Sequence, residues 1–318
     1  MKIIDKFNEA KGRTLFSFEI LPPPKGRHFE DIQKAIEPLL EFEPAYINVT
    51  YHREEYVYKK REKGYLEKVA VRKRPGTVGI CAAIKYKYNI DTVPHLICGG
   101  FTKEETENAL IDLSFLGIDN VLALRGDPVK TETHFVPTPG GHTNALGLVQ
   151  QISNLGKGIY LDEDMQDGEP LEFCIGVAAY PEKHVEAPNL AMDIEFLKKK
   201  IEAGASYAVT QLFFDNRHYF RFVEACRQAG ITVPIIPGIK PISRKSHLTY
   251  MPKFFHVEIP EVLARAIERC STDKEVEEVG TEWAIQQCKE LIKAGVPSLH
   301  FYTMGRSTQV QKIARQIF

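Results

Sequence analysis

The feature that most constrains this sequence is a repeated alternation of two kinds of segment. A short run of β-branched or aromatic residues is followed by a polar loop and then by a longer stretch with helical spacing. Eight such runs read as strands, at residues 14–21, 45–51, 92–98, 120–125, 172–180, 207–214, 233–239 and 298–303. Their near-continuous apolar interiors are typical of strands buried on both faces of a parallel sheet. We therefore predict an α/β fold, a single-domain (β/α)8 TIM barrel over residues 1–318, with an open doubly wound sheet as the alternative.

Glycines mark the ends of several predicted helices. The helical stretches at 103–116, 190–203, 217–229 and 275–294 are followed by Gly117, Gly204, Gly230 and Gly295, and glycine suits the left-handed position just past a helix. Residues 76–89 suit a buried helix or an extra strand, and we favour the helix. The stretches 128–142 and 156–169 are polar and rich in glycine or proline, so we expect loops there.

The composition excludes several classes of protein. The 41 basic and 42 acidic residues give a net charge of −1, which provides no field for attracting nucleic acid. The six cysteines form no CxxC pair and follow no secretory signal, and no apolar run reaches the roughly 18 residues that span a membrane. GxGxxG, Walker A, HExxH and GxSxG motifs are absent as well. We expect a soluble cytoplasmic protein with no metal site and no nucleic-acid or membrane partner.

Polar residues at the strand ends are the candidates for function, because the working face of such a barrel lies there. Glu19 stands in an apolar run before three prolines, where burial would raise its pKa and keep its proton near neutral pH. The alternative for Glu19 is an ion pair with a neighbouring cation. The Arg125-Gly126-Asp127 sequence allows close backbone approach by a ligand, although it could equally form a plain turn.

Further candidates follow other predicted strands. Gln211 places an amide on an apolar strand, where it could bind a heterocycle or a neighbouring strand end. Tyr180 and His184 follow the fifth strand, and the next helix carries Asp193, Lys199 and Lys200. Taken one by one, the lysines read as a solvated helix face.

Together these strand ends resemble the catalytic barrel of the methylenetetrahydrofolate reductases, from about residue 14 to about residue 306. The matching pieces, in order, are FEILPPP (18–24), VTY (49–51), PHLIC (94–98), ALRGDP (123–128), AAYPEKH (178–184), TQLFFD (210–215), IIPGIKPI (235–242) and HFYT (300–303). The resemblance implies FAD at the mouth of the barrel, reduced by NADH or NADPH, and a second step that reduces 5,10-methylenetetrahydrofolate to 5-methyltetrahydrofolate. By this resemblance Glu19 is the general acid of ring opening, Asp127 favours the cation that develops, and Gln211 holds the pterin.

The resemblance also assigns the remaining site residues. It implies flavin contacts at Thr50, Tyr51, His95, Arg125, Gly126, Asp127, Ala145, Tyr180, His184, Ala187, Asp193, Lys199 and Lys200. It implies folate contacts at Glu19, Asp127, Gln211, His247 and Arg306. Asn144, Phe196 and His247 depart from residues that the family often carries, where tyrosine, a polar flavin contact and glutamine are found.

Two other functions fit the same fold. One is a Schiff-base aldolase or lyase with Lys240 as the nucleophilic amine, and the other is a barrel that binds a ligand without catalysis. The family precedent also predicts a homo-oligomer. Because no segment follows the barrel, we expect a bacterial-type form without the regulatory domain of the eukaryotic relatives.

Overall fold

Eight parallel strands close into a barrel in the computed structural model of the chain, which describes residues 1–129 and 132–318. The strands are β1 (Leu15–Ile20), β2 (Tyr46–Val49), β5 (Asp91–Ile97), β6 (Asn120–Leu124), β7 (Cys174–Ala179), β8 (Tyr207–Leu212), β9 (Ile235–Ile239) and β10 (Ser298–Tyr302). They follow one another around the barrel in the order β1-β10-β9-β8-β7-β6-β5-β2. The closed ring confirms the predicted (β/α)8 barrel and excludes the open sheet. Each of the eight predicted strands is present, with boundaries that differ by at most two residues.

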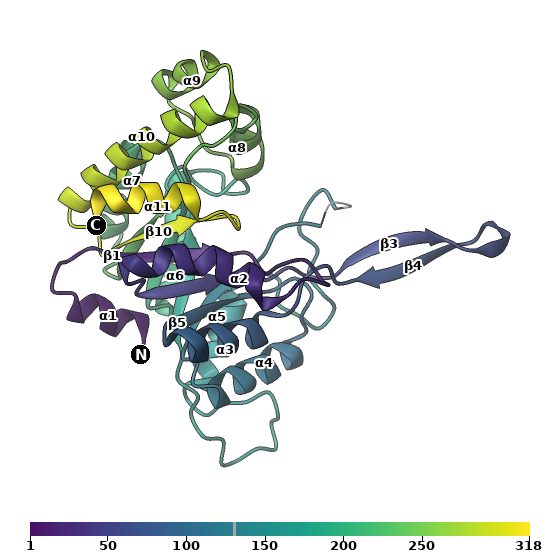
Figure 1. The fold of residues 1–318 in the computed structure, drawn as a ribbon. Helices are drawn as coiled ribbons and strands as arrows, with labels where there is room; N and C mark the ends of the chain where they lie inside the picture. The colour runs from purple at the N-terminus through teal and green to yellow at the C-terminus, as the bar shows by residue number, and fades with distance from the viewer. Residues whose placement is uncertain (130–131) are drawn as a thin grey trace.

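Helices surround this ring (Figure 1). They are α1 (Ile3–Glu9), α2 (Phe29–Ile36), α3 (Thr77–Tyr88), α4 (Lys103–Phe115), α5 (Ala145–Leu155), α6 (Leu190–Glu202), α7 (Asn216–Gln228), α8 (His247–Phe255), α9 (Glu261–Glu268), α10 (Asp273–Lys293) and α11 (Thr308–Ile317). Helix α3 confirms the helical prediction for residues 76–89, and the four predicted capping glycines all have positive φ. In the described part of the chain, no helix combines the length and the apolar character needed to cross a bilayer.

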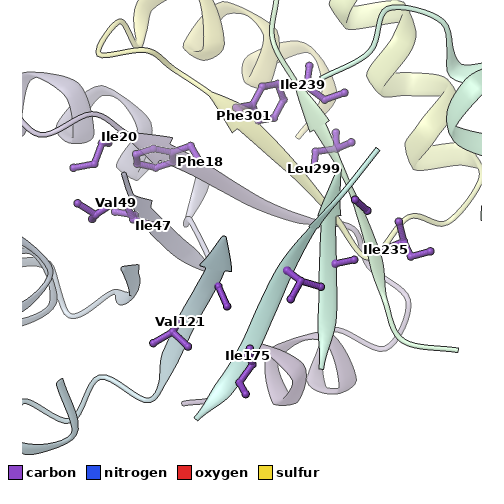
Figure 2. Close-up of a cluster of buried hydrophobic side chains, with 14 of the residues drawn as sticks. Phe18, Ile20, Ile47, Val49, Val121, Ile175, Ile235, Ile239, Leu299 and Phe301 are labelled. Atoms are coloured by element: carbon purple, nitrogen blue, oxygen red, sulfur yellow. The ribbon is translucent and has the colours of Figure 1, made fainter. Parts of the chain in front are cut away.

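Alternate strand residues face outward and build the main core. Phe18 and Ile20 of β1 lie with Ile47 and Val49 of β2 in one buried cluster (Figure 2), which also includes side chains of the surrounding helices. A fully buried side chain of this size contributes roughly 1.5–3 kcal/mol relative to an exposed one. Because side chains alternate along a strand, the residues between these positions face the barrel interior. Glu19 is one of them.

Helix α1 covers the amino-terminal end of the barrel. Its Ile3 is fully buried in a cluster with Tyr46 and Tyr207, which begin strands β2 and β8. The Phe7 ring packs edge-on against both tyrosine rings, with centroid distances of 6.4 and 6.3 Å. The backbone amide of Ile3 also donates a hydrogen bond of 2.8 Å to the side chain of Asn120. These contacts give the barrel a closed floor.

A two-stranded antiparallel hairpin, β3 (Glu55–Lys60) with β4 (Leu66–Val71), was not anticipated from the sequence. It follows β2 and projects away from the barrel as an arm (Figure 1). Most of its side chains are exposed, including Tyr56 and Tyr58. The predicted loops at 128–142 and 156–169 contain no helix or strand among their described residues, and residues 130–131 lie outside these.

Candidate active site

A cavity of about 1480 Å³ opens at the carboxyl ends of the barrel strands. All but one of the expected site residues line it: Glu19, Thr50, Tyr51, His95, Arg125, Gly126, Asp127, Ala145, Tyr180, His184, Ala187, Asp193, Lys200, Gln211, His247 and Arg306. Asn144 and Phe196, where the chain departs from the family pattern, line it too. Residues spread over nearly 290 positions of sequence therefore surround one space. The size of the cavity suits ligands larger than a single drug-sized molecule.

Glu19 is a nearly buried carboxyl group, and no lysine or arginine among the described residues is recorded as its partner. Its side chain is 13% exposed, and the nearest basic atom that the structure records is Nε2 of His95, at 3.5 Å from Oε2. Burial raises the pKa of Glu19 to about 8. Burial likewise lowers the pKa of His95 to about 3, so the imidazole is neutral near pH 7. A pKa of about 8 favours the protonated form of Glu19 at neutral pH, and no lysine or arginine pair with its carboxyl group is recorded among the described residues.

His95 is itself held by a neighbouring strand. The side-chain amide of Asn48, on β2, donates to Nε2 of His95 over 3.3 Å. Since Nε2 accepts this hydrogen bond, it has no proton to give to Glu19. The neutral imidazole therefore lies beside the Glu19 carboxyl group without neutralising it.

The loop after β6 carries Arg125, Gly126 and Asp127. The two terminal guanidinium nitrogens of Arg125 bind the Glu186 carboxylate, one of them at 3.0 Å, so the Arg125 side chain pairs with Glu186 rather than with Asp127. Gly126 has a φ of +87°, and a Cβ there would lie 3.3 Å from the side chain of Ile97. Only glycine fits this position without strain, and its backbone faces the cavity. No hydrogen bond to the Asp127 carboxylate is recorded among the described residues, which leaves it available to a ligand.

The segment between β7 and α6 forms an ordered edge of the cavity. The backbone amide of His184 donates to Asp193 at 2.7 Å, and the His184 ring packs edge-on against Tyr180 with centroids 4.8 Å apart. Lys200 is 6% exposed and donates to the carbonyl of Ala178 at 2.7 Å, and burial lowers its pKa to about 8. The solvated-face interpretation was therefore wrong for Lys200.

Lys199 is the expected residue that the structure places elsewhere. It is exposed on α6 and does not line the cavity. Adjacent residues of an α-helix point about 100° apart, so a helix that turns Lys200 toward the barrel must turn Lys199 away from it. Lys199 therefore lies outside the lining that the structure describes, and its assignment to the flavin site stays a prediction.

Several buried polar atoms in the lining lack hydrogen-bond partners. They include Oγ1 of Thr50, Oδ1 of Asn48 and Nε2 of His300. A buried polar group without a partner is costly, so these atoms are suited to contacts with a bound ligand. Together with the backbone of Gly126, which lines the cavity, and the cations Arg125 and Lys200, they fit a large heterocycle that carries phosphates, as FAD does.

The expected contacts separate onto two walls. The β2–β7 wall, formed by β2, β5, β6, β7 and the segments that follow them, carries Thr50, Tyr51, His95, Arg125, Gly126, Asp127, Ala145, Tyr180, His184, Ala187, Asp193 and Lys200. The β8–β1 wall, formed by β8, β9, β10, β1 and the segments that follow them, carries Gln211, His247, Arg306 and Glu19. Oε1 of Gln211 accepts from the backbone amide of Leu212 at 2.9 Å, so its side chain does not bind a neighbouring strand end.

Some lining residues were not singled out in the sequence. Asn48 and His300 face the interior, and Glu186 pairs with Arg125. The signal for the first two was available, because they occupy the same alternate positions of their strands as Thr50 and Tyr302, which also line the cavity. Glu186 lies in a loop, and no periodicity predicts which cation a loop residue meets.

One group of possible metal ligands lies outside the cavity lining. Glu182, His218 and Glu258 place ligand atoms within 4.8 Å of one another. Arg221 donates to Nδ1 of His218 at 3.0 Å, so the neutral ring carries its proton on Nε2, the nitrogen that faces Glu258. A metal bound there would have to displace the Nε2 proton, and one of its three ligands, Glu258, is exposed.

The fold and the cavity define a (β/α)8 barrel with a large ligand site at the carboxyl ends of its strands. The sequence pattern of the methylenetetrahydrofolate reductase family matches residues 3–317. The chain belongs to this family.

Named relatives agree with this membership. A methylenetetrahydrofolate reductase (NADH) of Arabidopsis thaliana is 34% identical over 317 residues, covering 96% of this chain and 49% of the relative. A 5,10-methylenetetrahydrofolate reductase of Pectobacterium carotovorum is 32% identical over 302 residues, covering 94% of this chain and 88% of the relative. The chain thus spans about half of the plant relative's length and most of the bacterial one's.

A solved structure shares the fold. It is an uncharacterized protein from Clostridium thermocellum, described as binding two copies of 5-methyl-5,6,7,8-tetrahydrofolic acid. Its TM-score is 0.59 at 14% identity, and the match covers 99% of this chain and 98% of that one. At this identity the likeness shows the architecture alone.

Proposed function

We propose that this chain reduces 5,10-methylenetetrahydrofolate to 5-methyltetrahydrofolate, with FAD as cofactor and NADH or NADPH as hydride source. The observation that carries the proposal is Glu19, a carboxyl group that holds its proton at neutral pH inside the shared cavity of a chain from this family. The reaction needs such an acid, because the methylene bridge of the folate is a closed five-membered ring. Opening that ring requires a proton on the departing nitrogen.

Glu19, Asp127 and Gln211 have different roles in the reduction of the folate. Glu19 donates its proton to the ring nitrogen as the bridge opens to a cationic iminium. The Asp127 carboxylate, which lines the cavity and is exposed, favours that cation through its negative charge. The amide nitrogen of Gln211 is left to bind the pterin, because its oxygen already accepts from Leu212.

The β2–β7 wall is the proposed flavin site. When bound, FAD supplies hydride exchange between a reduced nicotinamide and the folate. Arg125 and Lys200 would bind anionic groups, Thr50 would donate or accept through its unpartnered hydroxyl, and Gly126 would allow the cofactor to lie against the backbone. Folate and nicotinamide then use the remaining space of the cavity one after the other.

An absorbance experiment on purified protein tests this proposal. We expect a flavin spectrum that bleaches anaerobically with NADH or NADPH and returns when 5,10-methylenetetrahydrofolate is added, with 5-methyltetrahydrofolate identified by mass spectrometry. Comparing the bleaching rates of the two nicotinamides gives the preferred donor. Protein that neither binds added FAD nor transfers hydride to the folate would contradict the proposal.

The Schiff-base alternative has one supporting observation. Burial, and then the charge of Arg306, lower the pKa of Lys240 to about 8, which would favour a nucleophilic amine. Family membership supports the reductase instead. Borohydride reduction in the presence of the folate, followed by intact-mass analysis, separates the two: the reductase leaves Lys240 unmodified.

Two further expectations accompany the proposal: a cytoplasmic location and a homo-oligomeric state. The described cysteines are all free and buried, as in proteins of a reducing compartment. Analytical ultracentrifugation of the purified protein determines the oligomeric state.

A further inference from the structure

The arm formed by β3 and β4, residues 55–71, is a sheet of two strands, and no other strand in the described parts of the chain pairs with it. Figure 1 shows it extending away from the barrel. A hairpin of two strands is only marginally stable in water unless it packs against something else. Both of its edges also present unpaired backbone groups, which proteins usually cover or protect. The arm is therefore a segment that a partner would complete.

One face of the arm is apolar and exposed. The strand register places Tyr56, Tyr58 and Leu66 on the same face of the hairpin. Their side chains are 55%, 65% and 66% exposed, and Tyr65, beside the turn, is exposed as well. Tyrosine is enriched in protein interfaces, because its ring combines a large apolar area with a polar tip. This face therefore has the composition of an interface.

The tip of the arm, residues 59–68, is positively charged. It contains five basic and two acidic residues, a net charge of +3, so the rest of the chain carries −4. Arg61 pairs with Glu67 at 2.6 Å, but no ion pair is recorded for Lys59, Lys60 or Lys63 among the described residues. A partner that matches the tip must therefore offer carboxylates as well as apolar surface.

An acidic loop of the same chain has this complementary composition. It covers residues 159–169, between α5 and β7, and it contains no basic side chain but five carboxylates, at Asp162, Glu163, Asp164, Asp167 and Glu169. All five residues are exposed, and no ion pair is recorded for them among the described residues. Ile159, Leu161 and Met165 add exposed apolar side chains to the same loop.

The arm and the acidic loop lie at opposite ends of the barrel. The arm follows the carboxyl end of β2, whereas the loop leads into the amino end of β7. No hydrogen bond or ion pair between the two segments is recorded within residues 1–129 and 132–318. A second copy of the chain can supply the partner that the first copy does not. In a two-fold dimer each arm would meet the other copy's loop, which gives two identical contacts.

We propose that the arm of one copy binds the acidic loop of a second copy, through the lysines of its tip and the tyrosines of its exposed face. Opposite charges favour this contact, whereas two arms of the same charge repel each other, so pairing of arm with arm is disfavoured. The inference goes beyond the proposed function and does not depend on it, because residues 59–68 and 159–169 do not line the described cavity.

Sedimentation velocity over a series of protein concentrations tests the contact with two charge-reversed variants. The tip variant combines Lys59→Glu, Lys60→Glu and Lys63→Glu. The loop variant combines Asp162→Lys, Glu163→Lys and Asp164→Lys. Each should weaken self-association roughly a hundredfold, because like charges then face each other. An equimolar mixture of the two variants should associate as wild type does, because each arm again meets a loop of opposite charge.

A matched control reverses three exposed lysines that lie in neither segment, with Lys11→Glu, Lys274→Glu and Lys289→Glu. It should leave the dissociation constant of the oligomer within about twofold of wild type. Tyr58→Ser removes apolar surface without a change of charge and should weaken association roughly tenfold, the effect of losing one interface tyrosine. Circular dichroism checks that every variant is folded, which exposed substitutions rarely prevent.

Three results would overturn the inference. Wild-type protein that stays monomeric at every concentration would mean that the arm serves a different partner. Tip and loop variants that associate as wild type does would place both segments outside the interface. If each variant dissociates but their mixture stays monomeric, the arm and the loop do not contact each other. Turnover of the folate is measured separately, so its presence or absence leaves this test unaffected.

Discussion

The two walls of the cavity differ in how their charged groups are satisfied. On the β2–β7 wall, Arg125 is bound by Glu186, Lys200 by the carbonyl of Ala178, and Asp193 by the amide of His184. On the β8–β1 wall, Lys240 and Arg306 lack recorded side-chain partners in the described residues. Among the same residues, the ionisable group recorded beside the Glu19 carboxyl group is the imidazole of His95, which is neutral near pH 7. Apart from Asp127, the charged groups named on the first wall are bound within the protein, whereas those on the second wall have no recorded partner of opposite charge among the described residues.

This difference is informative about the kind of ligand that each wall serves. Groups that the protein already orients are suited to a ligand that stays bound, because little ordering remains to be done. Groups without partners are suited to a ligand that arrives, contributes charge and leaves. We interpret the β2–β7 wall as the cofactor side and the β8–β1 wall as the substrate side. The variants below test that division, in order of decreasing expected effect.

Glu19→Gln should separate the two half-reactions most strongly. The amide keeps the shape of the carboxyl group but has no acidic proton, so folate reduction should fall by roughly 10²–10⁴-fold, the usual contribution of a positioned acid. Flavin content and flavin reduction by the nicotinamide should remain. Stopped-flow absorbance of each half-reaction measures this, and nearly intact folate turnover would remove Glu19 from the mechanism.

Asp127→Asn tests the exception on the β2–β7 wall, since Asp127 has no recorded hydrogen-bond partner there. If its charge serves the folate cation, the substitution should slow the folate half-reaction roughly tenfold to a hundredfold, the effect of losing a charged interaction. The protein should retain its flavin. Identical stopped-flow traces for variant and wild type would mean that Asp127 takes no part in the chemistry.

The pH dependence of the folate half-reaction rate should follow the ionisation of Glu19. Burial raises its pKa to about 8, and the groups around it, His95 and Tyr302, do not ionise in this range because burial lowers the pKa of the first and raises that of the second. The folate half-reaction at saturating substrate should therefore be fastest below pH 8 and fall about tenfold per pH unit above it. Flavin reduction should lack this decline. A flat folate profile between pH 7 and pH 9.5 would contradict the assignment.

Substitutions of the neighbouring Lys199 and Lys200 have the smallest expected effect of the four tests, but they form the most closely matched pair of variants. Lys200→Met should weaken flavin binding roughly three- to tenfold, as expected for one lost hydrogen-bonding group. Lys199→Met changes the same chemistry on the exposed side of the same helix and should leave the flavin dissociation constant within about twofold of wild type. Fluorescence titration of apoprotein with FAD measures both. Equal effects would show that the cavity extends to Lys199.

Much of the barrel was predictable because buried parallel strands appear as continuous apolar runs. Strand β7, for example, reads CIGVAA, and it lies within the strand predicted at residues 172–180. The β3–β4 hairpin was not predictable in the same way, because a solvent-exposed arm has no buried face to impose a pattern. Its strands, EYVYKK and LEKVAV, mix apolar and charged residues without a regular alternation, so nothing in the sequence marks them as strands.

The site was predictable to the extent that strand ends converge by topology. Glu19, Asp127 and Gln211 are far apart in the sequence, yet a closed parallel barrel must bring their strand ends to one rim. Site residues on helices were harder to predict, because a single sequence does not fix which face of α6 is turned toward the cavity. The sequence therefore did not distinguish Lys199 from Lys200. Partners in loops, such as Glu186 for Arg125, depend on loop conformation and carry no sequence signal.

Helix α1 covers the amino-terminal end of the barrel beneath β2 and β8, and the described cavity opens at the opposite end. Ile3 and Phe7 fill the far end, so a nicotinamide and a folate that both need the same interior must pass the same rim. On the proposed function, the nicotinamide and the folate would therefore bind one after the other. On the proposed function, a helix at the start of the chain, far from any reacting atom, thus helps to set the order of events.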